Sequence, residues 1–216
     1  MKITYIGHSS FKIEINGKVI VIDPYDPALM GYKFPETSAD ILLLSHKDAE
    51  TTHMEGIKNC EHVIDSPGEY EIAEIFIYGL STFHDGESGA KNGKNTAFLI
   101  EDSNFSVLHL GSLGHELSKE TLEKIGAVDV LMIPVGGNYV IDAEKASKVI
   151  SSLEPGIVIP MHYNTKDSTH PEKLAELEEF LEEMGVEKGI AKRDSLELKS
   201  SVSDEETKVV VLKAEH

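Results

Sequence analysis

Short hydrophobic segments separated by turns fill the first half of the chain, and this pattern constrains the fold more than any other feature of the sequence. Residues 11–15 alternate apolar and polar side chains, which is typical of a strand with one exposed face. The unbroken apolar run 41–44 instead indicates a strand covered on both faces. Residues 84–95 are rich in Gly and Asn and are expected to form a mobile loop. The strands that we expect span residues 2–7, 11–17, 18–24, 40–46, 62–66, 75–84, 96–102 and 105–111.

Helices and strands alternate in the second half. The apolar residues of segments 118–126, 142–155 and 171–185 are spaced as in helices, and Ser118 and Asp142 stand at N-cap positions. This order predicts an α/β protein in which helices cover the outer faces of packed sheets. A chain of 216 residues is long enough for one large core, so we expect a single domain over residues 1–216. The later strands are expected at residues 128–137, 156–163, 196–199 and 208–213.

The composition excludes several classes of partner. A formal net charge of −18, with no run of Lys and Arg, argues against a nucleic-acid partner. No stretch approaches the roughly 20 apolar residues of a membrane span. Cys60 is the only cysteine, which excludes an intramolecular disulfide, and no signal-like leader precedes the first strand. We therefore expect a cytoplasmic protein whose partner is a small-molecule substrate, while the sequence does not predict an oligomeric state.

Histidines recur at the ends of the predicted strands. His46, His84 and His162 each end an apolar run, and His109 lies late in another. Strand ends at one edge of a sheet form a rim where distant side chains meet, so these four can converge on one site. Imidazole is the commonest protein ligand of Zn²⁺, Mn²⁺ and Fe²⁺. The alternative is that each histidine makes a separate structural hydrogen bond, which is the role we expect for His8.

Six sequence blocks resemble one family when they are taken in order. The chain is similar to the metallo-β-lactamase superfamily, and within it to the small hydrolase-like branch that includes L-ascorbate-6-phosphate lactonase. The resemblance implies a four-layer αββα sandwich with a one- or two-metal site at its edge, where a metal-bound hydroxide attacks an ester, a lactone or a phosphodiester. The blocks that carry it are residues 2–25, 65–72, 83–101, 108–115, 128–146 and 157–163.

Three positions match the site residues of this family. Asp23 matches an early aspartate that orients the metal ligands. His84 matches the middle histidine ligand, and His162 matches the last histidine ligand. The resemblance thus implies that His84 and His162 bind metal.

The defining H-x-H-x-D-H motif of the family is degenerate here. It begins with His46, but Asp48 replaces its second histidine, Glu50 replaces its aspartate and Thr51 replaces its last histidine. Ser112 stands where the family has an aspartate that bridges two metals. These losses argue against a dinuclear centre.

The remaining ligands predict a single metal site, if the site binds metal at all. The candidate ligands are His46, Asp48, His84 and His162, and the candidate catalytic carboxylates are Asp48 and Glu50. Two histidines and one carboxylate form a known catalytic set for zinc or ferrous iron. If the loop were helical, His53 would instead share a face with His46 and Glu50 and replace the lost ligand.

Two functions remain open from the sequence. One is a metal-dependent hydrolase that uses Zn²⁺, Mn²⁺ or Fe²⁺ on a small ester, lactone or phosphorylated substrate. The other is a metal-free, non-catalytic binding or regulatory protein that keeps the fold after losing its ligands.

Overall fold

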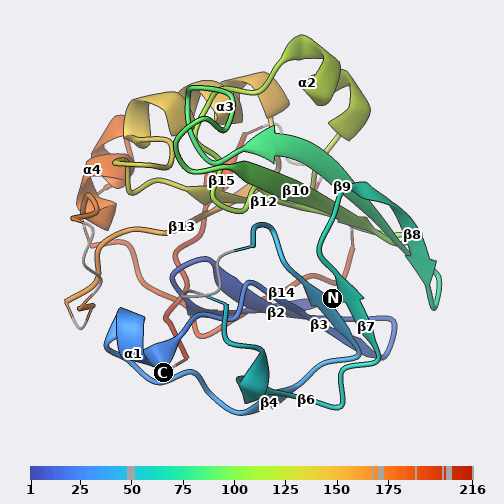
Figure 1. Cartoon of the computed structure of the whole chain (residues 1–216). Coiled ribbons are helices and arrows are strands. Elements are labelled where there is room, and N and C mark those ends of the chain that lie inside the picture. Colours follow the sequence, from blue (N-terminus) through green and yellow to red (C-terminus); the bar gives the residue numbers. More distant parts are fainter. Residues whose placement is uncertain are drawn as a thin grey trace.

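Two β-sheets packed face to face form the centre of the computed structural model (Figure 1). The structure describes residues 1–47, 52–166, 168–169, 173–187, 189–200, 202 and 206–215. The first sheet has the strand order β14-β1-β2-β3-β5-β7. Strands β1, β2 and β3 are antiparallel neighbours, whereas β3, β5 and β7 run parallel. The bounds are β1 Lys2–Gly7, β2 Ser10–Ile15, β3 Lys18–Ile22, β5 Ile41–Leu43, β7 His62–Ile64 and β14 Leu196–Glu197.

The second sheet has the order β15-β13-β12-β11-β10-β9-β8. Its strands β8 to β11 form an antiparallel meander, and β11, β12, β13 and β15 run parallel. The parallel half is buried because helices cover it, as apolar runs predict. The bounds are β8 Gly68–Ile72, β9 Ile75–Phe83, β10 Lys94–Glu101, β11 Ser106–His109, β12 Val130–Pro134, β13 Ile157–Met161 and β15 Lys208–Val209.

Helices cover the outer face of the second sheet. Figure 1 shows α2 (Lys119–Ile125), α3 (Ala143–Leu153) and α4 (Leu177–Glu183) above it. The outer face of the first sheet carries the single-turn helix α1 (Pro27–Met30), the strand pair β4 (Thr37–Ser38) and β6 (Ile57–Lys58), and a 3₁₀ turn at Met54–Gly56. The arrangement is the expected αββα sandwich, with one thin outer layer.

The predicted N-caps form. The Ser118 side chain accepts a hydrogen bond from the Thr121 amide, and the Asp142 side chain accepts one from the Lys145 amide at 2.9 Å. These bonds satisfy amides that a helix leaves without an internal partner, so the two helices begin where the sequence predicts.

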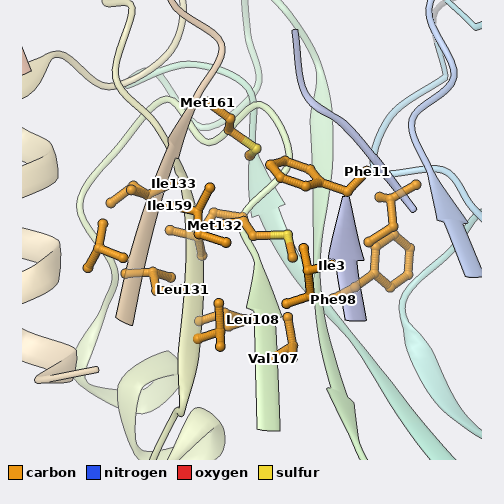
Figure 2. Packing of buried hydrophobic residues seen from close by; sticks show 14 of the residues in the cluster. Ile3, Phe11, Phe98, Val107, Leu108, Leu131, Met132, Ile133, Ile159 and Met161 are labelled. Carbon is orange, nitrogen blue, oxygen red and sulfur yellow. The ribbon is translucent and has the colours of Figure 1, made fainter. Parts of the chain in front are cut away.

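Residues from both sheets build the main core (Figure 2). Ile3 and Phe11 of the first sheet share one buried cluster with Phe98, Val107 and Met132 of the second. Phe98 and Met132 are fully buried. Burial of apolar surface between the sheets is therefore what fixes the two rims of strand ends relative to each other.

The last predicted helix begins later than expected. The spacing predicted a helix over 171–185, but α4 starts at Leu177. The Ala175 amide donates to Gly136 O at 2.8 Å, and Ala175 O accepts from the Asn164 amide at 2.8 Å. These tertiary bonds hold residues 174–176 outside the helix, and Leu174 is buried there. Across the described ranges, no helix combines the length and apolar character that a membrane crossing requires.

Candidate functional site

His46 and His84 lie next to each other at the rim of the sandwich. His46 follows β5 of the first sheet, and His84 follows β9 of the second. Their ring centroids are 5.2 Å apart. The two sheets thus bring together side chains that are 38 positions apart in the sequence, as the strand-end pattern predicts.

A buried carboxylate fixes the tautomer of His46. Asp23 Oδ1 accepts from the Ser45 amide at 2.7 Å, and Asp23 Oδ2 accepts from the Ser45 hydroxyl at 2.5 Å. Ser45 Oγ also lies 2.9 Å from His46 Nδ1. Because the hydroxyl has one proton and an ionised carboxylate only accepts, Ser45 Oγ must accept the Nδ1–H of His46. In the neutral imidazole this leaves the lone pair on Nε2, where it can bind a metal, which agrees with the orienting role expected of Asp23.

His162 and His8 form a second imidazole pair. Their ring centroids are 3.9 Å apart, and the His162 amide donates to His8 O at 2.7 Å. Both residues have a positive φ, 53° for His8 and 55° for His162, at the ends of their strands. Burial, followed by the neighbouring rings of His8, His84 and His46, lowers the pKa of His162 well below its usual value. The His162 imidazole is therefore neutral at neutral pH.

Tyr139 connects the two histidine pairs. Its ring makes edge contacts with His84 at a centroid distance of 5.2 Å and with His162 at 5.5 Å. Tyr139 lies in a tight turn in which Gly137 N donates to Ile141 O and Val140 N donates to Gly137 O. Neither Tyr139 nor His8 was predicted from the sequence to take part in the site. The available signal was the position of both residues just after a buried strand.

His109 does not join the site as a ligand. It is fully buried, and its Nε2 lies 2.9 Å from Ser9 O, so Nε2 must donate to that carbonyl. Its Nδ1 accepts from the Gly111 amide at 3.1 Å. His109 does lie near the site, because Asp23 and His46 both influence its pKa, but both of its ring nitrogens are occupied and it is not available as a metal ligand. The alternative, a structural hydrogen bond, holds for this residue.

His53 lies in a different setting from the one that the helical alternative requires. Thr52 forms an antiparallel bridge with Tyr25, and the His53 amide donates to Pro24 O at 2.7 Å. The His53 ring packs against Phe34 at a centroid distance of 6.1 Å. Residues 52 and 53 are therefore not part of a helix that continues from His46, and that interpretation is wrong.

The loop after β9 is closed rather than open. The Asp85 carboxylate accepts backbone hydrogen bonds from Glu87, Gly89, Lys91 and Asn92, at 2.7 to 2.9 Å. These bonds lower the pKa of Asp85 to about 2. The His84 amide also donates to Gly93 O at 3.1 Å. Residues 84–95 were expected to form a mobile loop, but their backbone amides are held by hydrogen bonds to the Asp85 carboxylate.

A cavity of about 530 Å³ opens beside His46 and His84. This volume lies in the range of small-molecule sites, roughly 300–1,000 Å³. Most of its lining residues have polar side chains, which can form hydrogen bonds with a bound substrate. The other lining residues are Ser45, Lys47, Asp65, Ser66, Pro67, Ser81, Asn92, Gly93, Lys94, Asn95 and Thr96.

The nitrogen donors at this rim suit part of a metal site. The hydrogen bond at His46 Nδ1 leaves Nε2 as the ligand nitrogen of the neutral ring, and His162 Nδ1 is buried without a hydrogen-bond partner, as expected of a ligand nitrogen. Within the described ranges, however, no three His, Cys, Asp or Glu side chains are grouped so as to hold a metal ion. The predicted ligand Asp48, the predicted catalytic residue Glu50 and Thr51 all lie outside the described residues. The described histidines thus provide an incomplete ligand set.

Comparisons of sequence agree with the geometry. A family model described as "Beta-lactamase superfamily domain" matches residues 2–162. A UPF0173 metal-dependent hydrolase from Nanoarchaeum equitans is 31% identical over an alignment that covers 90% of this chain and 98% of the relative.

Comparisons with solved structures point the same way. A Thermotoga maritima protein, described as a proposed Zn-dependent hydrolase of the metallo-beta-lactamase superfamily, is 34% identical with a TM-score of 0.74. The match covers 98% of this chain and 99% of that chain. CmlA, a diiron beta-hydroxylase from Streptomyces venezuelae, is 16% identical with a TM-score of 0.55, over 78% of this chain and 46% of that one. The likeness to CmlA concerns the fold alone.

Proposed function

The chain belongs to the metallo-β-lactamase superfamily, and from this premise we propose that it is a metal-dependent hydrolase with one divalent metal at the rim beside His46 and His84. The observation that carries the proposal is the pairing of these two imidazoles, with the His46 tautomer set by Ser45 and Asp23. A buried relay that keeps one imidazole nitrogen unprotonated is the arrangement found behind metal-binding histidines.

The proposed ligands are His46 and His84, with Asp48 as the carboxylate and His162 as a further candidate. Two histidines and a carboxylate leave coordination positions open for water and substrate. We propose zinc, as the name of the Thermotoga maritima relative suggests, with Mn²⁺ and Fe²⁺ as the alternatives that the same ligands accept. When bound, such a metal lowers the pKa of water and polarises the bond to be cleaved.

The remaining work falls to residues of the chain. Asp23 and Ser45 hold His46 in one tautomer, and the Asp85-centred loop fixes the backbone of His84. Glu50, two positions beyond Asp48, is the proposed group that accepts and returns the proton during hydrolysis. The volume of the cavity next to His46, and the polar side chains among its lining residues, support a small ester, lactone or phosphorylated molecule as the substrate.

Elemental analysis of protein purified without chelators tests this proposal. We expect close to one transition metal ion per chain in the wild type, and none in His84→Ala. His53→Ala is the control and should keep the metal, because the His53 ring packs against Phe34. Absence of metal from the wild-type protein, even after incubation with Zn²⁺, Mn²⁺ or Fe²⁺, would overturn the proposal. It would leave the alternative of a metal-free, non-catalytic binding or regulatory protein.

A further inference from the structure

The cavity beside His46 and His84 is positively charged inside a strongly acidic protein. Among the described residues, its charged lining residues are Lys47, Lys94 and Asp65, two cations against one anion, whereas the whole chain has a formal net charge of −18. Because attraction between charges is strongest at short range and is screened over about 10 Å in ordinary salt, the local sign matters most to a bound molecule.

The two lysines are in different states. The Lys47 ammonium is 2.8 Å from Asp65 Oδ2, so its charge is already compensated. Lys94 is exposed at the start of β10 and forms no ion pair with the carboxylates of the described residues. Within the part of the chain that the structure describes, Lys94 is therefore the cation of the cavity without a carboxylate partner.

Lys94 and His84 stand at opposite ends of the same closed loop. The bond from the His84 amide to Gly93 O, at 3.1 Å, joins the two ends, and β9 and β10 continue the pairing through Phe83 and Lys94. The Asp85 carboxylate fixes the backbone between them. The backbone positions of His84, the candidate metal ligand, and of Lys94 are thus set by one hydrogen-bonded element, which favours selection of a charged substrate.

We propose that this cavity binds substrates that carry an anionic group, a carboxylate or a phosphate, and that Lys94 is the residue that recognises this group. The inference rests on the proposed function, since it places the scissile bond of the substrate at His46 and His84. Lys47 is less suited to this role, because its ammonium group would have to leave Asp65 before it could bind an anion.

Two matched pairs of probes test the proposal. The first pair is mono(4-nitrophenyl) succinate, an anionic ester, and 4-nitrophenyl acetate, a neutral one. We expect Lys94→Gln to lower the ratio of kcat/KM for the anionic ester to that for the neutral ester about fivefold, the size of one partly exposed charge pair. Lys91→Gln makes the same charge change in the same loop, but outside the cavity lining, and should leave this ratio unchanged.

The second pair measures binding without turnover. Calorimetric titration with succinate, and with neutral succinamide as its control, is carried out on the wild type, Lys94→Gln and Lys91→Gln. His84→Ala, which removes a proposed metal ligand, shows whether succinate binds without the metal. We expect succinate to bind and succinamide not to bind. The affinity for succinate should be lost in Lys94→Gln and kept in the other proteins.

The outcomes separate this inference from the proposed function. Succinate binding that depends on Lys94, with neither ester hydrolysed, would support the inference and count against hydrolase activity. Hydrolysis with an ester ratio and a succinate affinity that ignore Lys94 would overturn the inference and leave the hydrolase in place. Failure of succinate to bind any of these proteins would also overturn it.

Discussion

Ser45 Oγ lies 2.9 Å from His46 Nδ1 and accepts a hydrogen bond from the Nδ1–H, because the Ser45 hydroxyl already donates its own hydrogen bond to Asp23. Removing this hydroxyl frees His46 to rotate and to change tautomer. We expect Ser45→Ala to weaken zinc binding roughly 10- to 100-fold, the usual effect of losing a residue that orients a ligand. Competition titration with a chromophoric zinc chelator measures the change.

Ser81→Ala is the matched control for this variant. Ser81 lines the same cavity and is exposed, but no hydrogen bond to a histidine involves it among the described residues. We expect its zinc affinity to equal that of the wild type. Equal zinc affinities in Ser45→Ala and the wild type would show that the relay does not serve a metal ligand.

Asp85 should control the order of the loop that carries His84. Asparagine keeps one carbonyl oxygen and loses the charge, so Asp85→Asn cannot satisfy all four amides that the carboxylate now accepts. We expect a lower Tm and faster hydrogen exchange at the amides of residues 87, 89, 91 and 92. Asp102→Asn is the control, because Asp102 accepts from the Asn104 and Phe105 amides in a distant turn. Unchanged exchange at residues 87–92 in Asp85→Asn would contradict the anchoring role.

The strand ends of the site could be predicted, but the use of each ring nitrogen could not. His46 and His84 each end an apolar run, and the end of such a run predicts the end of a strand. That signal was sufficient to predict that the two residues lie at the same rim. His109 has the same local signal, yet both of its nitrogens are taken, one by Ser9 O, a residue 100 positions away. Hydrogen bonds over such separations leave no trace in local sequence patterns.

The last helix, α4, shows that tertiary hydrogen bonds also restrict what can be predicted about the fold. Apolar spacing locates α4, because Leu177 and Leu181 do face the core. Ala175 carries equally good helical propensity, but its bonds to Gly136 and Asn164 outweigh that preference. For α4, local propensity thus predicts that the helix exists, while tertiary hydrogen bonds decide where it begins.

His109 should make stability depend on pH. Burial lowers its pKa below the usual value of 6.5, so the folded protein takes up this proton less readily than the unfolded chain. The contribution is therefore fully present above pH 6.5 and is lost as the pH falls towards the folded pKa. We expect the free energy of unfolding in urea to be lower at pH 5.5 than at pH 7.5. His109→Gln, which cannot titrate, should show a smaller decrease, and an equal decrease in both proteins would rule out this origin.

The contact between the sheets should dominate global stability. Phe98 is fully buried between them, so Phe98→Ala removes a ring and leaves a cavity. We expect a loss of roughly 3–5 kcal/mol in the free energy of unfolding. Phe76, on the neighbouring strand β9, is 40% exposed, and Phe76→Ala should change stability by about 0.5 kcal/mol. Chemical denaturation compares the two, and similar losses would mean that the sheets do not pack through Phe98.

Restoring the family motif should create a second metal position. We expect the combined variant Asp48→His, Glu50→Asp, Thr51→His and Ser112→Asp to bind two zinc ions per chain, as elemental analysis would show. Ser112 is buried, so an aspartate there is costly without a metal and should lower stability until zinc is added. Ser112→Asp alone should be destabilised and should gain no second zinc ion, because it adds a single ligand. A combined variant that folds but binds no more metal than the wild type would show that residues 46–51 do not correspond to the metal-binding motif of the family.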